Sequence, residues 1–282
     1  MLNSQQLSEF GRDGYLVLEN FANHADCDAL IARTAVLVAD FEPPEKKYIF
    51  LTVEQEQTSD DYFLESGDKI RLFFEQDAFD DDGALRQDKF NSINKIGHAI
   101  HDLDPVFDAF SRQASLAEIA GDAGLTEPLL LQSMIIFKPP RIGGEVVWHQ
   151  DATFLHTEPS RILGMWFALE DATEENGYLW GLPSSRRSGL KSRYLRATGG
   201  GVQTITDDDT AWPDSAFVPF EVKKGTLIIF DGMLPHGSAA NRSAQSRHAY
   251  TLHLFTESVA TCRKTGCSVA PPCHCAVFNR LM

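Results

Sequence analysis

Cysteine is almost missing from the first 261 residues, where Cys27 stands alone. A disulfide framework needs paired cysteines, so this stretch is typical of a protein from a reducing compartment. Basic residues are also few: Lys and Arg number 25 against 40 Asp and Glu, for a formal net charge of −15. Such a surface repels phosphate backbones and anionic lipid headgroups. We therefore expect no nucleic-acid partner and no membrane partner, although a local basic pocket could still bind an anionic substrate.

Long apolar runs are absent as well. No stretch of the sequence approaches the roughly 20 apolar residues of a membrane-spanning helix. Residues 1–10 lack the charged-then-apolar pattern of a secretion signal, and the last three residues are not a Ser-Lys-Leu address. We expect a cytoplasmic monomer that acts on a small molecule, anionic or acyl in character.

The apolar content that is present, 43% of 282 residues, is enough for one sizeable core. Helical spacing predicts helices over residues 24–40 and 104–121, the second begun by Asp104 before Pro105. The remaining apolar segments are short and bounded by turn residues, which is typical of strands. They cover residues 15–18, 129–137, 162–169, 178–182, 217–222, 226–230 and 248–255. We predict one domain over residues 1–261, mainly β with flanking helices, whose jelly-roll core occupies about residues 128–256.

The sharpest motif is a histidine and an aspartate two residues apart, His149 and Asp151. In a strand such residues point to the same face and can chelate one ion. Taken alone, the pair also fits a surface dyad or an aspartate that orients a core histidine. His236, just after the run 226–230, is the candidate third ligand. Two imidazoles and one carboxylate leave three octahedral positions open, as in the oxygen-activating Fe(II) enzymes.

Arg247 follows His236 by eleven positions and opens the last expected strand. A guanidinium matches a carboxylate with two parallel hydrogen bonds. An isolated arginine usually pairs with a surface Asp or Glu. The combined order of His-x-Asp, then His, then Arg favours a dicarboxylic keto acid that binds iron at one end and Arg247 at the other.

The sequence around these residues resembles the phytanoyl-CoA dioxygenase family, a branch of the double-stranded β-helix Fe(II)/2-oxoglutarate oxygenases. The similarity spans about residues 5–258. It is carried by residues 13–18, 61–71, 92–99, 132–134, 143–146, 149–152 and 170–173. The resemblance implies a double-stranded β-helix (cupin-like) core, with Fe(II) as cofactor and 2-oxoglutarate and O2 as cosubstrates.

The resemblance also implies roles for single residues. Lys95 would face a carboxylate of 2-oxoglutarate, and Ser238 would assist Arg247 at the far carboxylate. Met134, Gln150 and Trp166 would line the same pocket. The implied reaction is hydroxylation of a C–H bond with release of succinate and CO2. Asp151 favours an oxygenase, because halogenating relatives lack this carboxylate.

Two other functions use the same residues. His₂-carboxylate also suits Zn²⁺, so a zinc hydrolase is one rival, although it gives no role to Arg247 or Lys95. A non-catalytic protein that binds 2-oxoglutarate is the other. His98 and His101, three apart in an expected helical turn, are interpreted as capping or surface residues rather than further ligands.

Three further segments bear on substrate binding or on the C-terminus: a basic stretch, residues 183–186 and a Cys-rich tail. A locally basic stretch could steer an anionic substrate or could be a solvated loop; it comprises Arg186, Arg187, Lys191, Arg193 and Arg196. The family's Pro-Gly-Ser-His segment is replaced here by residues 183–186, Pro-Ser-Ser-Arg, which puts the family's substrate selection in doubt. Residues 262–282 form an atypical Cys-rich tail, whose spacings do not match a paired C-x-x-C zinc site.

Overall fold

The computed structural model describes residues 1–44, 46–50, 61–197, 201–213, 216–256 and 260–261. The predicted Cys-rich tail, residues 262–282, therefore lies outside the described residues. Among the helices in these ranges, none is long and apolar enough to cross a membrane.

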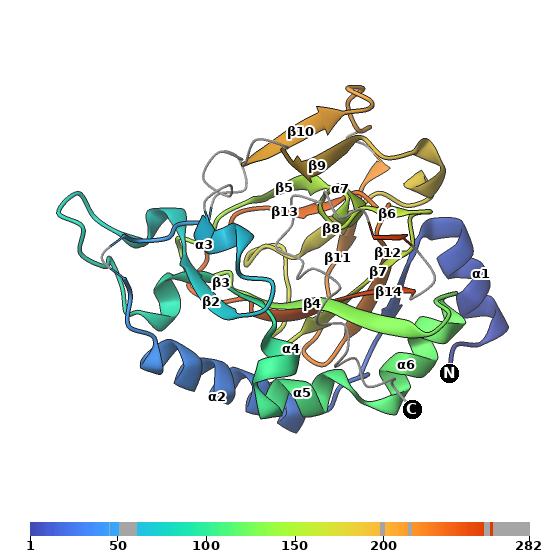
Figure 1. The fold of residues 1–282 in the computed structure, drawn as a ribbon. Helices are drawn as coiled ribbons and strands as arrows, with labels where there is room; N and C mark the ends of the chain where they lie inside the picture. The colour runs from blue at the N-terminus through green and yellow to red at the C-terminus, as the bar shows by residue number, and fades with distance from the viewer. Residues whose placement is uncertain (45, 51–60, 198–200, 214–215, 257–259, 262–282) are drawn as a thin grey trace.

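Two antiparallel sheets form the centre of the molecule (Figure 1). The larger sheet has seven strands in the order β1-β12-β7-β14-β4-β3-β2. In that order they are Tyr15–Leu18, Leu227–Asp231, Ile162–Ala168, Ala249–Thr256, Pro128–Ile136, Ile93–His98 and Ile70–Phe74. The smaller sheet has the order β11-β8-β13-β5. Its strands are Val218–Phe220, Leu179–Gly181, His236–Ser238 and Val146–His149. The predicted β fold with flanking helices is confirmed.

Side-chain alternation along β14 explains why this strand is central to the site. Tyr250 and Leu252 point into the main hydrophobic core on the helical side of the sheet. Thr251 and His253, like Arg247 just before the strand, line a cavity on the opposite side. Because successive strand residues face opposite sides, the same segment supplies both the core and the cavity wall.

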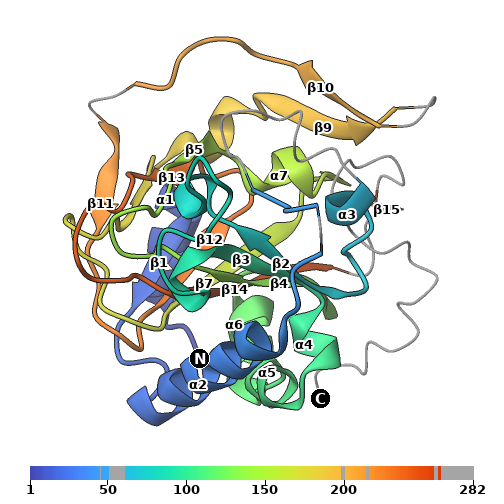
Figure 2. The same ribbon diagram turned by 90° about the vertical axis from the view of Figure 1, so that its left-hand side faces the viewer.

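Helices cover the outer face of the larger sheet (Figures 1 and 2). These helices are α2 His24–Asp40, α4 Ile100–Leu103, α5 Pro105–Ser111 and α6 Ala114–Asp122. The other helices in the described residues are α1 Ser4–Asp13, α3 Asp61–Leu64 and α7 Asp151–Phe154. Within the described ranges, 3₁₀ turns form η2 Gln76–Ala78, η3 Phe90–Ser92 and η4 Ser185–Ser188. The helix predicted over 24–40 is confirmed as α2.

The single helix predicted over 104–121 is wrong, because the structure has two helices, α5 and α6. Asp104 begins α5 as expected, accepting hydrogen bonds from the N–H groups of Val106 and Phe107. The chain leaves helical geometry at Arg112. Its guanidinium donates to the His101 carbonyl oxygen and to Asp102, both at 2.5 Å, which holds the break against α4. Gln113 then has extended geometry and begins α6.

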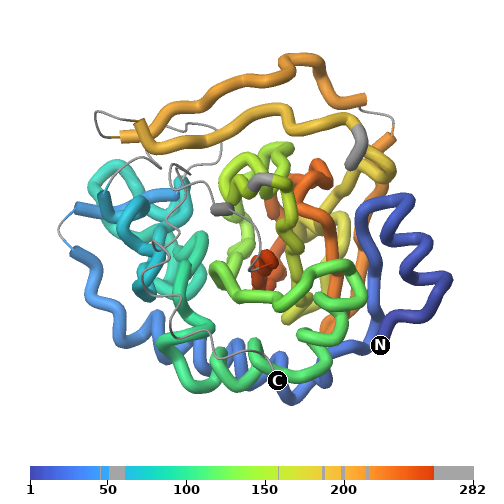
Figure 3. The backbone as a smooth tube through the Cα atoms, turned by 45° about the vertical axis from the view of Figure 1, so that its right-hand side comes forward, coloured from blue at the N-terminus to red at the C-terminus, as the bar shows by residue number. Residues whose placement is uncertain are grey.

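A two-stranded hairpin lies across one end of the double sheet, above α7 and β5 (Figures 1 and 3). It consists of β9, Ser192–Arg196, and β10, Val202–Thr206. Arg196 ties its far end to the molecule by donating to the Leu64 carbonyl oxygen at 2.5 Å. A second short pair joins β6, Thr157–Glu158, with β15, Ala260–Thr261. The β9–β10 hairpin therefore forms part of the rim of the cavity.

Candidate metal centre and cosubstrate pocket

Three predicted ligands meet at the smaller sheet. His149 ends β5 and His236 begins β13, and the two residues are directly paired across the strands. The candidate ligand atoms of His149, Asp151 and His236 all lie within 4.8 Å of one another. One detail of the prediction is wrong: Asp151 is not in the strand of His149 but begins helix α7. The extended backbone of Gln150 between them still brings both side chains to one point.

Both histidines are oriented by backbone carbonyl groups. His149 Nδ1 lies 2.8 Å from the Val147 oxygen, and His236 Nδ1 lies 3.0 Å from the Leu234 oxygen. A carbonyl oxygen only accepts, so each Nδ1 carries the proton and each Nε2 keeps its lone pair for a metal. Burial, followed by the effect of His149, lowers the pKa of His236 to about 4. The imidazole is therefore neutral at neutral pH, which is the form that binds metal.

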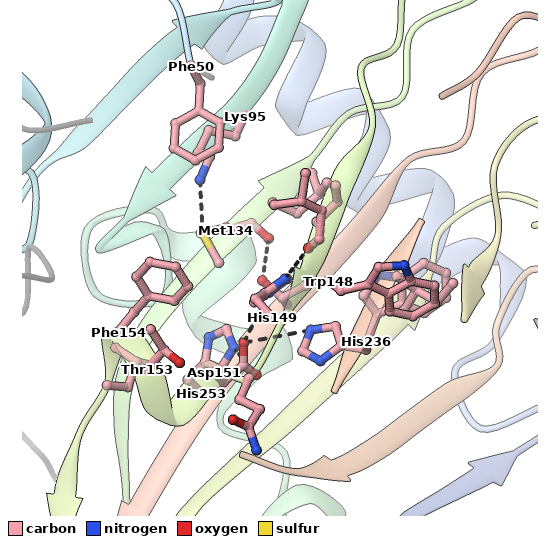
Figure 4. A pocket seen from close by; sticks show the side chains of 18 of the residues that line it. Phe50, Lys95, Met134, Trp148, His149, Asp151, Thr153, Phe154, His236 and His253 are labelled. Atoms are coloured by element: carbon pink, nitrogen blue, oxygen red, sulfur yellow. Dashed lines mark hydrogen bonds and ion pairs between the residues drawn. The ribbon is translucent and has the colours of Figure 1, made fainter. Parts of the chain in front are cut away.

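Asp151 supplies the negative charge of the cluster (Figure 4). Burial alone would raise its pKa, but the neighbouring imidazoles of His253, His236 and His149 outweigh burial and hold the pKa well below the usual value. Oδ1 lies 3.6 Å from His149 Nε2 and 3.7 Å from His236 Nε2. The arrangement is a His-Asp-His facial triad that presents two nitrogens and one oxygen to a divalent ion.

Arg247 is 1% exposed and lines the same cavity. Its Nε donates to the Gly177 carbonyl oxygen at 3.2 Å, and its guanidinium lies 5.4 Å from the centre of the Trp166 ring. Burial lowers its pKa to about 10, so the group remains charged at neutral pH. Among the described residues, neither Nη1 nor Nη2 has a hydrogen-bond partner, and the buried Ser238 Oγ has none either. These buried donors fit a carboxylate that is supplied by a ligand.

The other residues implied by the resemblance lie on the same cavity wall. Lys95 on β3 has its Nζ 3.9 Å from Met134 Sδ on β4 and 3.3 Å from the centre of the Phe50 ring (Figure 4). Trp166 faces the cavity from β7. Gln150 also lines it, but its amide group bonds to the backbone. Its Nε2 donates to two carbonyl oxygens, at 3.0 and 2.8 Å, and its Oε1 accepts from a backbone N–H at 2.9 Å. These four positions remain predicted 2-oxoglutarate contacts.

Comparison with known proteins agrees with this geometry. Residues 10–249 match the family model described as Phytanoyl-CoA dioxygenase (PhyH). The chain belongs to the phytanoyl-CoA dioxygenase family. It is 44% identical over 262 residues to phytanoyl-CoA dioxygenase domain-containing protein 1 of Mus musculus, covering 90% of each chain. It is also 44% identical over 253 residues to the phytanoyl-CoA dioxygenase of Arabidopsis thaliana, covering 90% of this chain and 88% of the relative. The predicted family is confirmed.

Solved structures support the fold of this family member. EctD from S. alaskensis with bound Fe gives a TM-score of 0.63 at 23% identity, covering 96% of this chain and 82% of that one. The same enzyme with 2-oxoglutarate and 5-hydroxyectoine gives 0.64 at 24%. At these identities the likeness concerns the fold, which is the double-stranded β-helix. The phytanoyl-CoA dioxygenase family fold and the His-Asp-His triad are thus both present in this chain.

The predicted setting of His98 and His101 is wrong. His98 ends strand β3 rather than lying in a helical turn, and both rings are 2% exposed. His98 Nδ1 lies 2.7 Å from the Ser66 hydroxyl and His101 Nδ1 lies 2.7 Å from the Ser133 hydroxyl. Neither residue belongs to the metal cluster found among the described residues. His101 instead fixes α4 against β4.

The basic stretch is largely neutralised where its side chains are described. Lys191 pairs with Asp208 at 2.6 Å, and Arg193 pairs with Asp207 at 2.7 Å. Arg196 is engaged with the Leu64 carbonyl oxygen, as noted above. These three residues stabilise the β9–β10 hairpin, so they offer little charge for steering an anion.

The replaced family glycine also has a structural explanation. Ser184 has φ 60° and ψ 6°, the left-handed conformation that glycine adopts at little cost. Its N–H donates to the Asp13 carbonyl oxygen at 3.1 Å, and its hydroxyl lies 3.4 Å from Asp13 Oδ1. The serine therefore keeps the turn that the family glycine would make.

Two buried residues of the site were missed from the sequence. Lys138 is 1% exposed and donates to the Gly144 carbonyl oxygen at 2.6 Å and to the Ala239 carbonyl oxygen. Burial holds its pKa well below the usual lysine value. His253 contacts Asp151 directly. Its sequence signal was its position on the cavity face of β14, six residues after Arg247.

The cavity itself has a volume of about 300 Å³ and joins the triad to the Arg247 pocket. Many of its lining side chains are aromatic. They include Phe50, Phe63, Trp148, Phe154, Tyr194 and Trp212. A cavity of this size and lining suits a small organic ligand.

Proposed function

We propose that this protein is a Fe(II)- and 2-oxoglutarate-dependent dioxygenase that hydroxylates a C–H bond and releases succinate and CO2. One observation carries the proposal beyond the metal triad. The buried guanidinium of Arg247 keeps two N–H-bearing nitrogens without a partner among the described residues, in the cavity that contains the triad. A buried charge is costly unless it is paired, so the site is built for an anionic ligand.

Each residue has a distinct task in this proposal. His149 Nε2, Asp151 Oδ1 and His236 Nε2 would hold Fe(II), because these three atoms converge and their rings are already oriented. Bound together, the metal, 2-oxoglutarate and O2 supply the oxidising chemistry. Arg247 and Ser238 would bind the far carboxylate of 2-oxoglutarate, and Lys95 would face its other end. The aromatic walls would exclude water and hold the substrate.

Two rival functions make different predictions for one assay. A zinc hydrolase would use the triad without 2-oxoglutarate and would leave Arg247 without a ligand. A non-catalytic protein would bind 2-oxoglutarate without turning it over.

The test is succinate formation from 2-oxoglutarate by the purified protein. It is run with Fe(II) and O2, with Fe(II) but no O2, and with Zn(II) in place of Fe(II). We expect slow turnover, even without a substrate, in the first condition and none in the other two. His149→Ala should abolish both turnover and iron binding. Succinate formation that is equal in all three conditions, or iron content unchanged in His149→Ala, would refute the assignment.

The wider setting is part of the same proposal. The acidic composition and the single cysteine before residue 262 favour a cytoplasmic monomer that acts on a small molecule. The neutralised basic residues on the hairpin and the aromatic cavity walls favour contacts with the apolar part of that substrate.

A further inference from the structure

His253 contacts the carboxylate ligand from behind. It lies on β14, is 4% exposed, and has its Nε2 3.0 Å from Asp151 Oδ2. Oδ2 is the oxygen that does not face the two ligand histidines. The other ring nitrogen, Nδ1, lies 3.3 Å from Gln132 Nε2. Figure 4 shows His253 beside Asp151, with His149 and His236 on the other side of the carboxylate.

Both contacts assign the same tautomer to His253. The ionised carboxylate of Asp151 can only accept, so His253 Nε2 carries a proton and donates it. The amide nitrogen of Gln132 can only donate, so His253 Nδ1 accepts. A neutral imidazole has one donor and one acceptor, and here each meets its complement.

The backbone around His253 favours this placement. His253 pairs with Gln132 across β14 and β4, and the register between the strands shifts at the next residue, so that Leu254 pairs with Leu130. A β-bulge of this kind redirects side chains and is frequent beside active sites. The extra residue of this bulge, Leu131, lies on β4 beside Gln132, whereas β14 keeps its regular alternation, which places His253 on the cavity face with Thr251.

We propose that His253 is a positioning residue that keeps Asp151 a one-oxygen ligand of the metal. A carboxylate can bind a metal through one oxygen or through both. The hydrogen bond from His253 occupies Oδ2 and directs Oδ1 toward His149 and His236. One-oxygen binding leaves three positions of an octahedral ion open, which the proposed reaction needs for 2-oxoglutarate and O2. This inference rests on the metal site of the proposed function.

Two amide variants isolate the hydrogen bond. Glutamine places its amide nitrogen near the position of histidine Nε2, whereas asparagine is too short to reach Oδ2. His253→Gln should therefore preserve the contact with Asp151, and His253→Asn should lose it while keeping a polar side chain. His253→Leu provides a second variant without a donor if the asparagine variant does not fold. His101→Leu is the matched control, because it likewise removes a buried imidazole. The partner of His101 is the Ser133 hydroxyl, which is not part of the triad.

The experiment uses Co(II) as the probe, with its affinity and its visible absorption spectrum as readouts. Loss of an outer contact to a ligand typically weakens metal binding by about 10–100-fold. We expect that loss, with an altered spectrum, for His253→Asn and His253→Leu. His253→Gln should bind Co(II) within about threefold of wild type, and His101→Leu should change the melting temperature but not the spectrum.

The outcomes separate this inference from the metal site. Wild-type affinity and spectrum in both His253→Asn and His253→Leu would overturn the positioning role while leaving the site intact. Equal losses of Co(II) affinity in His253→Gln and His253→Asn would also overturn it, since the ability of the side chain to contact Asp151 Oδ2 would then make no difference. A wild-type protein that binds Co(II) no better than His149→Ala would overturn the site and this inference together.

Discussion

Replacing Arg247 by lysine tests the cosubstrate pocket without removing its charge. Arg247 presents Nη1 and Nη2 into the buried pocket, where neither has a partner among the described residues. We expect both to bind the far carboxylate of 2-oxoglutarate. Lysine keeps a positive charge but offers one ammonium on a flexible stem, so it cannot make two parallel bonds.

The size of the effect follows from losing one of those bonds. A hydrogen bond to a charged group contributes roughly 1.5–3 kcal/mol. Since every 1.4 kcal/mol corresponds to about tenfold in affinity, Arg247→Lys should weaken 2-oxoglutarate binding by about 10–100-fold. Iron content should remain near the wild-type value, because Arg247 is not a ligand.

The assay is a calorimetric titration of 2-oxoglutarate into metal-loaded protein without O2, with metal content measured on the same preparation. Arg242→Lys is the control, since Arg242 is exposed and donates only to the Arg141 carbonyl oxygen among the bonds described. Thermal melting without 2-oxoglutarate measures how much stability Arg247→Lys loses with the hydrogen bond from Arg247 Nε to the Gly177 carbonyl oxygen. A folded Arg247→Lys protein with wild-type affinity for 2-oxoglutarate would refute the pocket assignment. Loss of iron instead would mean that Arg247 supports the metal ligands.

Three further predictions concern the ligand set, pH and the turn at Ser184. Asp151→Gly should bind metal more weakly and lose hydroxylation, and unchanged succinate production would exclude Asp151 as a ligand. Burial lowers the pKa of His101 to about 4 from an unfolded value near 6.5. The unfolded chain therefore binds the extra proton between these values, so His101 alone should cost the metal-free protein up to about 1.4 kcal/mol of stability per pH unit as the pH falls from 6.5 to 4. Urea unfolding across this range should show a shallower slope for His101→Gln, and identical slopes would refute the assignment. Ser184→Gly should raise stability by about 1 kcal/mol, because it relieves the left-handed conformation; a lower melting temperature would show that the bond to Asp13 matters more.

Seven strands could be predicted because their apolar runs end at turn residues; they are β1, β4, β7, β8, β11, β12 and β14. The run expected over 129–137, for example, is β4 at Pro128–Ile136. The break between α5 and α6 could not, because residues 111–114 contain no proline or glycine to mark it. The break depends on Arg112, whose guanidinium bonds to α4. Such a tertiary contact has no periodic signal in the sequence.

In the candidate site, too, local sequence signals could be predicted and tertiary contacts could not. His149, Asp151 and Arg247 could be proposed from spacing and donor chemistry, because the motif is local and the reaction needs a carboxylate partner. His253 could not, since its contact with Asp151 joins residues 102 positions apart. Lys138 was missed for a similar reason: a lysine in sequence is usually a solvated charge, and burial at 1% is a property of the folded chain.

A crystal structure of the protein with Mn(II) and 2-oxoglutarate, obtained without O2, tests the central claim most directly. We predict one ion bound by His149 Nε2, Asp151 Oδ1 and His236 Nε2. The far carboxylate of 2-oxoglutarate should accept hydrogen bonds from both Nη atoms of Arg247. An ion held by other residues, or 2-oxoglutarate bound away from Arg247, would contradict the account.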